Sequence, residues 1–504
     1  MNKEIHRLKK KRKISSRILW IICLLSTIVF SFTFYNLPMF PKRWIFMGIS
    51  LTFLMLIFLL IITCKLKPYN IISKSLNLLF ALSLLITSIA LPYVTDKVAA
   101  IFDHVVANTV RINVYALKDS YKQEHALKQT DFKQTTAFKD WQKARFGGLS
   151  YLDKENQDYG FTSLNKQLKT NVERVNYATI DKSIRALYDG DIDALVMSEP
   201  YVQLLSESAE NAHFKDDTYI VASYIHELAA IKTSRTNVVN QPFALFVAGN
   251  DQPGSLSLFG RTDVDMIMVI NPKQQQVLML NLPRDSYVSN PAYADKKDKL
   301  THLGMSGLNV TMKSLSKLLD INIDHYALVN FTTFMQIITV LKGVDIENPY
   351  AFKALDGRFF KKGMIHLDAD EALMYVRERK SLKNGDFDRN MHQQLVMKAI
   401  IKKLTSLHGI LHFNNLLDTL KNSFLTNLKV QDIYALMAKQ LDKGGNWDII
   451  NYHLTGESVL RKTASFPQQK LAVVLLNKKQ LSFIKDELQK IFNGDRIEQE
   501  QLSD

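Results

Sequence analysis

The stretch GRTDVDMIMVINPKQQQVLMLNLPRDSYV, residues 260–288, contains the pattern from which both the fold and a candidate site can be predicted. Two apolar runs, Met266–Ile270 and Val277–Leu282, flank a turn centred on Asn271-Pro272-Lys273. Apolar runs of this length between turn residues are typical of strands that are buried on both faces. The stretch therefore predicts a β-hairpin inside a sheet that is covered on both sides.

Four charged residues are expected at the open end of this hairpin. In an antiparallel pair that folds about Lys273, residues near position 262 lie opposite residues near position 284. Arg261 and Asp263 therefore emerge at the same end as Arg284 and Asp285. Two arginines and two carboxylates that meet where buried strands end predict a functional site.

The positive charge of the chain is concentrated at its N-terminal end. Of the formal net charge of +15, residues 1–100 contribute +12, because they contain 14 lysines and arginines and only two acidic residues. This distribution indicates a membrane anchor and argues against a nucleic-acid-binding face. The 504 residues are enough for two or three domains, each with its own core.

Three uncharged stretches follow the basic N-terminus, namely Ile18–Pro41, Trp44–Cys64 and Ser75–Thr95. Each is long enough to cross a bilayer as a helix, which needs roughly 20 residues. The positive-inside rule places residues 1–17 in the cytoplasm as a basic tail. Three transmembrane helices over residues 18–95 then make the chain a multi-pass protein of the cell membrane, with its C-terminal domains extracellular. Both cysteines fall in the spans, so no thiol or zinc-thiolate chemistry is expected outside.

The extracellular part is expected to form two α/β domains. Residues 105–231 alternate strand-like and helix-like segments and predict a small accessory domain. Its segment RALYDGDIDALVMSEP (185–200) is similar to a strand and turn near the ligand cleft of solute-binding proteins, so ligand binding and a packing or spacer role both remain open. A polar linker, residues 232–241, precedes a second domain over residues 243–492. Besides the hairpin, this domain is expected to contain strands at Phe243–Ala248 and Tyr326–Asn330 and helices at Gly307–Leu319, Phe331–Leu341, Asp368–Tyr375 and Phe387–Leu404.

Asp251 and Asp263 are candidate metal ligands. Asp251 follows the strand that ends at Ala248, and its spacing of twelve residues from Asp263 allows one loop to return both carboxylates to the same end of the sheet. Mg²⁺ is typically held by one or two carboxylates together with water and substrate phosphate. The alternative is that NDQPG, residues 250–254, forms only a turn, because these residue types favour turns.

Further arginines occur on or after two later helices. Arg377 and Arg379 follow the third expected helix, in a run that is also typical of a solvated helix end. On the next helix, Arg389 and Gln393 fall on an otherwise apolar stripe. A buried arginine needs a partner. A phosphate, which arginine binds bidentately, and an internal carboxylate are the two alternatives.

Several arginines around two carboxylates suit one chemistry, the binding of a polyphosphate together with a metal ion. Phosphoryl transfer depends mainly on positioning and on neutralising the charge that develops. The sequence contains no GxxxxGK[ST] loop, no HExxH and no GxSxG, which are the motifs of the main competing chemistries. Phosphoryl transfer is therefore the predicted reaction class.

The sequence resembles the LytR-CpsA-Psr family of cell-envelope proteins over roughly residues 243–404. The resemblance is carried by GND (249–251), GRTDVDMIMVINP (260–272), NLPRDSYV (281–288), YALVNF (326–331), GV (343–344), HLDADEALMYVRERK (366–380) and GDFDRNMHQQ (385–394). It implies an α-β-α sandwich with a central mixed β-sheet and a hydrophobic tunnel for a polyprenyl chain, whose pyrophosphate lies at the tunnel mouth. The three spans and the accessory domain resemble the capsule-associated streptococcal CpsA branch.

The resemblance also implies an activity. It is the transfer of a capsular polysaccharide or related glycopolymer from a polyprenyl (undecaprenyl) pyrophosphate carrier to peptidoglycan, with release of polyprenyl phosphate. Mg²⁺ or Mn²⁺ is the implied cofactor, pyrophosphatase is an implied side activity, and proteins of capsule biosynthesis are implied partners. The main alternative is a non-catalytic membrane protein that binds lipid-linked glycan or regulates capsule synthesis. Transcriptional regulation is disfavoured, because the 17 cytoplasmic residues leave no room for a DNA-binding module.

Roles in the site are carried over by motif. Asp251 and Asp263 would hold the metal, and Asp285 would either orient the acceptor or pair with Arg284, with pairing favoured. The stretch DKLTHLGMSG (298–307) departs from the family pattern, so the residues that line the acceptor cleft are not assigned. The pyrophosphate would be bound by Arg261, Arg284, Arg377 and Arg379, with Arg389 and Gln393 completing the cradle.

Overall fold

The structure is a computed structural model. It describes residues 2–37, 40–65, 71–103, 108–118, 138–205, 210–228, 237–250, 256–411, 413–420, 424–500 and 502. The chain forms two compact units. The first comprises residues 1–104, 404–421 and 428–446, and the second comprises residues 105–403, 422–427 and 447–504.

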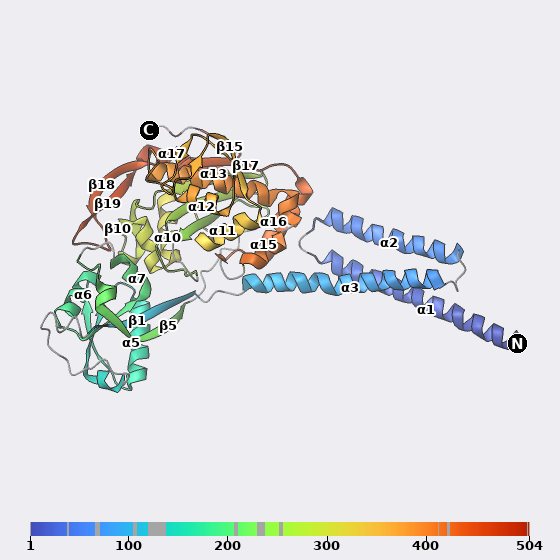
Figure 1. Ribbon diagram of the computed structural model, residues 1–504, viewed down its shortest axis with the longest axis horizontal. Coiled ribbons are helices and arrows are strands. Elements are labelled where there is room, and N and C mark those ends of the chain that lie inside the picture. Colours follow the sequence, from blue (N-terminus) through green and yellow to red (C-terminus); the bar gives the residue numbers. More distant parts are fainter. Residues whose placement is uncertain are drawn as a thin grey trace. The chain divides into compact units, whose positions relative to one another are not determined.

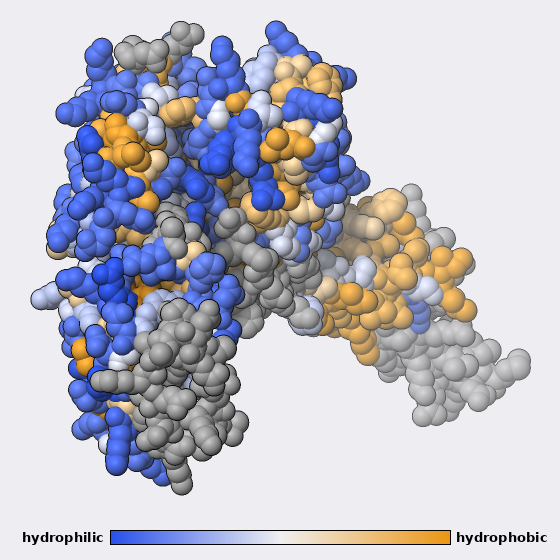
Figure 2. Space-filling view, turned by 60° about the vertical axis from the view of Figure 1, so that its left-hand side comes forward, coloured by the Kyte–Doolittle hydropathy of each residue, from blue (hydrophilic) through white to orange (hydrophobic). Residues whose placement is uncertain are grey.

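Three long helices dominate the first unit: α1 (Asn2–Tyr35), α2 (Lys42–Lys65) and α3 (Ile71–Asp103). All three are long and apolar enough to cross a membrane (Figure 1). Their large apolar side chains are mostly exposed, for example Phe32 at 72% and Ile89 at 73%, and form the orange surface of these helices in Figure 2. Such exposure is unfavourable in water and is expected of helices that face lipid. The three apolar helices predicted at the N-terminus are confirmed.

Three shorter helices complete the first unit: α14 (Leu407–Leu411), α15 (Phe413–Leu420) and α16 (Val430–Lys443). Their buried side chains Ile410, Val430, Tyr434 and Met437 form a small core. At the start of α2, Arg43 pairs with Asp442 at the end of α16, with 2.6 Å between Nε and Oδ1. Arg43 also donates to the carbonyl of Leu441 over 3.3 Å. The last carbonyl groups of a helix have no partner within the helix, so the Arg43 guanidinium satisfies acceptors at the end of α16.

The accessory domain, at the N-terminal end of the second unit, contains a five-stranded sheet in the order β3-β2-β4-β1-β5. Strands β3 and β4 run parallel to β2, and β1 is antiparallel to both β4 and β5. Its elements are β1 (Asn108–Leu117), η1 (Phe138–Lys143), β2 (Arg145–Leu149), α5 (Lys154–Leu168), β3 (Glu173–Tyr177), α6 (Ile180–Tyr188), β4 (Ala194–Ser198), α7 (Glu199–Leu204), α8 (Phe214–Asp217) and β5 (Thr218–Leu228).

The domain that follows is built on a six-stranded mixed sheet in the order β16-β11-β6-β7-β8-β17. The strands of this sheet are β6 (Phe243–Asn250), β7 (Val264–Asn271), β8 (Gln276–Leu282), β11 (His325–Asn330), β16 (Phe424–Thr426) and β17 (Asp448–His453). The shorter or peripheral strands are β9 (Tyr287–Asn290), β10 (Lys296–Lys299), β12 (Val344–Asn348), β13 (Phe352–Lys353), β14 (Phe359–Phe360), β15 (Gly363–Leu367), β18 (Gly456–Lys462) and β19 (Lys470–Leu476). The helices are η3 (Pro291–Tyr293), α9 (Leu300–Leu303), η4 (Gly304–Ser306), α10 (Leu308–Leu319), α11 (Phe331–Val340), α12 (Ala369–Arg377), α13 (Asp386–Thr405) and α17 (Lys478–Phe492).

Helices cover both faces of this sheet. Because side chains alternate along a strand, Ile267 and Leu280 face one layer, where they share a core with Leu315 of α10 and Leu488 of α17. Asn281 faces the other layer, where its amide donates to the backbone oxygen of Asn390 on α13 over 3.5 Å. The mixed α/β fold with helices on both faces of a central sheet is therefore confirmed.

The predicted hairpin is formed by β7 and β8. The two strands pair antiparallel from Asp265 opposite Leu282 to Asn271 opposite Gln276. Every residue of β8 is buried. The side chain of Asn271 accepts hydrogen bonds from the amides of Lys273 and Gln274, which closes the turn locally.

An aromatic cluster joins the end of α12 to α13. The ring of His392 stacks on Tyr375, with 4.0 Å between centroids, and lies 5.1 Å from the ring of Phe352. His392 Nδ1 donates to the Tyr375 backbone oxygen over 3.1 Å. This packing fixes the helix end that carries Arg377 against the helix that carries Arg389. Burial lowers the pKa of His392 from 6.5 to about 4.

The buried histidine makes the domain sensitive to acid. Between pH 6.5 and about 4 the unfolded chain binds a proton on His392 that the folded chain does not. The contribution of neutral His392 to the free energy of unfolding is therefore fully present above pH 6.5 and falls by about 1.4 kcal/mol per pH unit between pH 6.5 and about 4. We predict that His392→Gln in the full chain reduces the drop in melting temperature between about pH 7 and about pH 5. Substitution of the exposed His366 by Gln serves as the control, and equal drops in both variants would contradict the prediction.

Candidate functional site

A pocket of about 440 Å³ opens where β7 begins and β8 ends. Both charged and apolar residues line it. The charged and polar lining residues are Asp263, Arg284, Arg377, Glu378, Arg379, Lys380, Arg389 and Gln393. The apolar lining residues are Val264, Phe331, Leu355, Met374 and Val376. Cations outnumber carboxylates in this wall, so the pocket suits an anionic ligand.

The register of the hairpin brings Asp263 and Arg284 together. Because Asp265 pairs with Leu282, the residues just beyond the ladder also lie opposite each other. Asp263 and Arg284 form an ion pair there, with both side chains about four-fifths buried (18% and 21% exposed). Burial alone would lower the pKa of Arg284, but Asp263 and Asp285 beside it raise that pKa.

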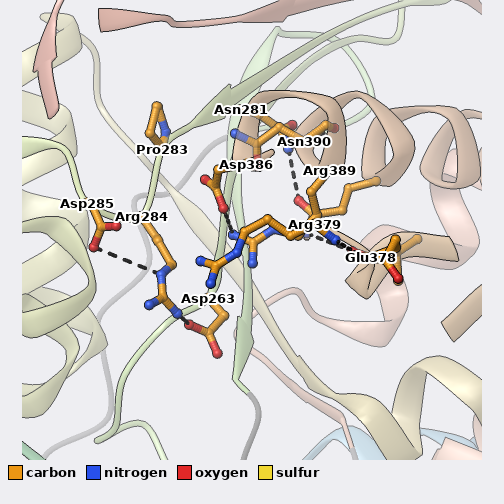
Figure 3. A network of polar contacts seen from close by, with 12 residues as sticks. Asp263, Asn281, Pro283, Arg284, Asp285, Glu378, Arg379, Asp386, Arg389 and Asn390 are labelled. Carbon is orange, nitrogen blue, oxygen red and sulfur yellow. Dashed lines mark hydrogen bonds and ion pairs between the residues drawn. The ribbon is translucent and has the colours of Figure 1, made fainter. Parts of the chain in front are cut away.

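Arg389 reaches the pocket from α13. Its Nη2 lies 2.5 Å from Oδ1 of Asp386, one turn earlier in the same helix. The geometry is not that of a hydrogen bond, and Nε and Nη2 find no acceptor among the described residues. Burial lowers the pKa of Arg389, so desolvation of this guanidinium is only partly offset by Asp386. Figure 3 shows Arg379 and Arg389 projecting toward the Arg284–Asp263 pair.

Arg377 and Arg379 are presented by the end of α12. That helix begins at a capping box in which Asp368 and Glu371 bond each other's backbone amides, as their spacing predicts. Glu378, between the two arginines, is buried and accepts hydrogen bonds from the amides of Leu355, Arg379 and Ser381 over 2.9, 2.8 and 3.1 Å. The Glu378 carboxylate thus fixes the backbone, and both arginine side chains stay exposed.

Two further residues shape this wall. The guanidinium of Arg377 lies over the ring of Phe331, 4.2 Å from its centroid. Gln393 connects three elements, because its amide donates to the Val376 backbone oxygen over 3.5 Å and its oxygen accepts from Asn281 over 3.3 Å.

Two predicted site residues, Arg261 and Asp285, are not among the lining residues of this pocket, and a third lies outside the part of the chain that the structure describes. Asp285 lies 3.4 Å from Nζ of Lys299 and 4.0 Å from Nε of Arg284, so it has a lysine partner that the sequence did not indicate, besides the expected arginine. Asp251 lies outside the described residues.

The chain was compared with models of known protein families. The model of the LytR_cpsA_psr family matches residues 206–487, which is more than half of the chain. The chain belongs to the LytR_cpsA_psr family.

Parts of the chain are also similar to curated relatives and to a solved structure. The chain is 32% identical over 238 residues to the polyisoprenyl-teichoic acid–peptidoglycan teichoic acid transferase TagU of Halalkalibacterium halodurans, covering 46% of this chain and 77% of the relative. It is 32% identical to the TagU of Bacillus cereus over 204 residues, covering 40% of this chain and 66% of the relative. The crystal structure of B. subtilis TagV matches with a TM-score of 0.43 and 26% identity, covering 50% of this chain and 98% of that chain.

Several residues of this candidate site were not predicted. Glu378 lies in a charged run that is typical of solvent-exposed residues, so its buried role had no signal of its own. Asp265 lies next to the apolar run of β7, and its carboxylate is buried at 2% exposure. Burial raises the pKa of Asp265 to about 8, which favours the uncharged carboxyl at neutral pH. The position of an aspartate next to the apolar run of β7 could have indicated this buried carboxyl group from the sequence.

The described donor set is compatible with a divalent cation whose shell is completed by water or by other ligands. Asp263 supplies one carboxylate at the pocket wall, and its amide donates to the Gly249 oxygen over 2.8 Å, at the end of the strand that Asp251 follows. The buried side-chain oxygens of Asn250 and Thr262 have no hydrogen-bond partner among the described residues. The described residues contain no group of three or more metal-binding side chains. Mg²⁺ fits such a site, because it commonly uses one or two carboxylates and completes its shell with water and phosphate.

Proposed function

We propose that this protein transfers a glycopolymer from a polyprenyl pyrophosphate carrier to peptidoglycan and releases polyprenyl phosphate. The observation that carries the proposal is the pocket that Arg284, Arg377, Arg379 and Arg389 line together with Asp263. Curated relatives at 32% identity are named as transferases that act on polyisoprenyl-teichoic acid and peptidoglycan, which supports the same reaction class here.

The pyrophosphate is assigned to the arginines that line the pocket. Arginine binds phosphate oxygens bidentately through its planar fork. The buried Nε and Nη2 atoms of Arg389 donate no hydrogen bond to an acceptor among the described residues. A phosphate oxygen in the pocket would supply that acceptor. Exposed Arg377 and Arg379 can close on the ligand without breaking buried contacts.

The polyprenyl chain is assigned to the apolar residues that line the pocket and to helix α11. Helix α11 is strongly apolar, yet only Thr333 and Ile338 in it are buried. Its first residue, Phe331, lines the pocket together with Leu355 and Met374. Apolar side chains that remain half-exposed beside an anion pocket suit a ligand with a charged head and a hydrocarbon tail. The predicted lipid tunnel is proposed to run along this helix.

In the proposed reaction an acceptor hydroxyl attacks the phosphorus that bears the glycan. The bond from that phosphorus to the bridging oxygen breaks, the polyprenyl phosphate leaves with the bridging oxygen, and the hydroxyl proton passes to the phosphate product or to solvent. Arg284 and Arg389, which are largely buried, neutralise the charge that develops on the phosphate oxygens. A cation held by Asp263, with Asp251 as the predicted second ligand, would supply further charge neutralisation when bound. Water in place of the acceptor would give the pyrophosphatase side activity.

The cargo is proposed to be a capsular polysaccharide or a related wall glycopolymer. The three spans and the accessory domain resemble the capsule-associated branch of the family, whereas the curated relatives are named for teichoic acid. Capsule biosynthesis proteins are the proposed partners if capsule is the cargo.

The protein is proposed to be a multi-pass membrane protein with a cytoplasmic N-terminus and extracellular C-terminal domains. The Arg43–Asp442 pair supports this, because it places the segment between the first two spans on the same side as α16. We predict that a single cysteine at Ser381, in a chain whose Cys23 and Cys64 are replaced by Ala, reacts with a membrane-impermeant maleimide on intact cells. A cysteine at Ser15 should react only after lysis, and the opposite pattern would reverse the topology.

The transferase proposal is tested with the full chain in detergent and a polyprenyl-pyrophosphate-linked glycan. We predict Mg²⁺-dependent release of polyprenyl phosphate. We expect a loss of about 100-fold or more in Arg284→Gln and in Asp263→Asn, because each removes a charge next to the reacting phosphates. The matched control is Arg174→Gln, which removes an arginine of the accessory domain that pairs with Asp158. Full activity in both site variants would remove the proposal.

The same assay separates the transferase from a non-catalytic lipid-glycan binder. A binder would retain the lipid on the protein and release no polyprenyl phosphate, even in a single turnover with protein in excess. An arm without acceptor measures the hydrolytic side activity.

A further inference from the structure

The accessory domain uses the edge of its sheet where ligands commonly bind to dock onto the neighbouring domain. In open α/β sheets, ligands bind outside the carboxyl ends of the parallel strands. Here the residues at the ends of β2 and β4, including Leu149 and Met197, share one buried core with Met305 and Phe466 of the other domain. This edge is therefore an internal interface, which favours the packing role over ligand binding at this position.

A buried tyrosine forms the polar contact of that interface. Tyr201, in the helix that follows β4, is 1% exposed, and its hydroxyl lies 2.9 Å from Oγ of Ser306 in η4. Burial, with the nearby carboxyls of Asp153 and Asp298, raises the pKa of Tyr201 well above its usual range. Asp153 belongs to the accessory domain and Asp298 to β10, which places this hydroxyl between the two domains.

The segment that Tyr201 contacts supports one end of the catalytic hairpin. Gly304, two residues before Ser306, accepts a hydrogen bond from the amide of Gly260 over 2.9 Å. The approach is so close that a Cβ on Gly304 would lie 2.2 Å from the Gly260 oxygen. Gly260 directly precedes the Arg261–Asp263 segment, so the position of η4 constrains the entry to β7.

The adjoining segment supports the other end. The amide of Thr301 donates to the Arg284 oxygen and the amide of Leu300 to the Ser286 oxygen, both over 2.9 Å. Lys299, next to them, contacts the carboxylate of Asp285. Asp298 anchors this segment, because its buried carboxylate accepts hydrogen bonds from the side chains of Asn290, His302 and Ser465.

We propose that the accessory domain is a buttress of the pyrophosphate site and that Tyr201 is a positioning residue, which acts through Ser306 and the Gly304–Gly260 contact on the Asp263–Arg284 pair. The other three arginines lie outside the braced segments. Arg377 ends α12, Arg379 follows two residues later, and Arg389 lies on α13. Loss of the brace should therefore impair the chemical step more than it impairs retention of the lipid head group.

The test is a double-mutant cycle in the full chain with Tyr201→Phe, Ser306→Ala and both together. Each single variant is expected to lower kcat about five- to tenfold, as expected for the loss of one positioning hydrogen bond, with little change in KM for the lipid substrate. The double variant should be no slower than either single variant, because both remove the same contact. The control is Tyr188→Phe, which removes a tyrosine hydroxyl that donates to Asp217 over 3.0 Å within the accessory domain. Additive losses, or an equal effect of Tyr188→Phe, would overturn the proposal.

The activity readout rests on the proposed transferase function, so backbone hydrogen exchange provides an independent one. Residues 258–266 and 283–288 should exchange faster in Tyr201→Phe than in the unmodified chain, and Tyr188→Phe should leave them unchanged. Faster exchange in a chain that proves to have no transferase activity would support the buttress and reject the function. Unchanged exchange and unchanged kcat in Tyr201→Phe would reject the buttress alone.

Discussion

The ion pair between Asp263 and Arg284 depends on the antiparallel register of β7 and β8, and the rest of the site is arranged around that pair. A shift of one residue in the register would turn the charged pair away and move every buried side chain of β8 to the opposite face. The two layers of helices make such a shift costly, because both faces of the sheet are covered. The turn at Asn271 and the brace from Thr301 and Leu300 hold the two ends of the hairpin.

Positively charged side chains outnumber carboxylates around this pair. Arg389 carries buried nitrogens without acceptors among the described residues, and the exposed arginines at the end of α12 have Glu378 between them. The Glu378 carboxylate accepts hydrogen bonds from the backbone amides of this turn. In the proposed complex, phosphate oxygens would offset the desolvation of the two largely buried arginines, Arg284 and Arg389.

The sequence could predict those parts of the structure in which local pattern and tertiary structure agree. The apolar runs on either side of Asn271 predicted the hairpin and its open end, and the spacing of Asp368 and Glu371 predicted the start of α12. The stripe on α13 left two partners open for Arg389, and the structure shows the carboxylate of Asp386 next to it. Contacts between distant segments had no local signature. The Lys299–Asp285 pair and the Tyr201–Ser306 contact join residues that no periodicity relates.

One pocket is proposed to bind the pyrophosphate through arginines at the end of β8, at the end of α12 and on α13. A structure of the full chain with a bound polyprenyl pyrophosphate tests it most directly. Both phosphates should lie within hydrogen-bond distance of Arg284, Arg377, Arg379 and Arg389, with Arg389 turned from Asp386 toward a phosphate oxygen and the hydrocarbon chain along α11. Phosphates bound elsewhere, or an Arg389–Asp386 pair that persists beside an empty pocket, would contradict the account.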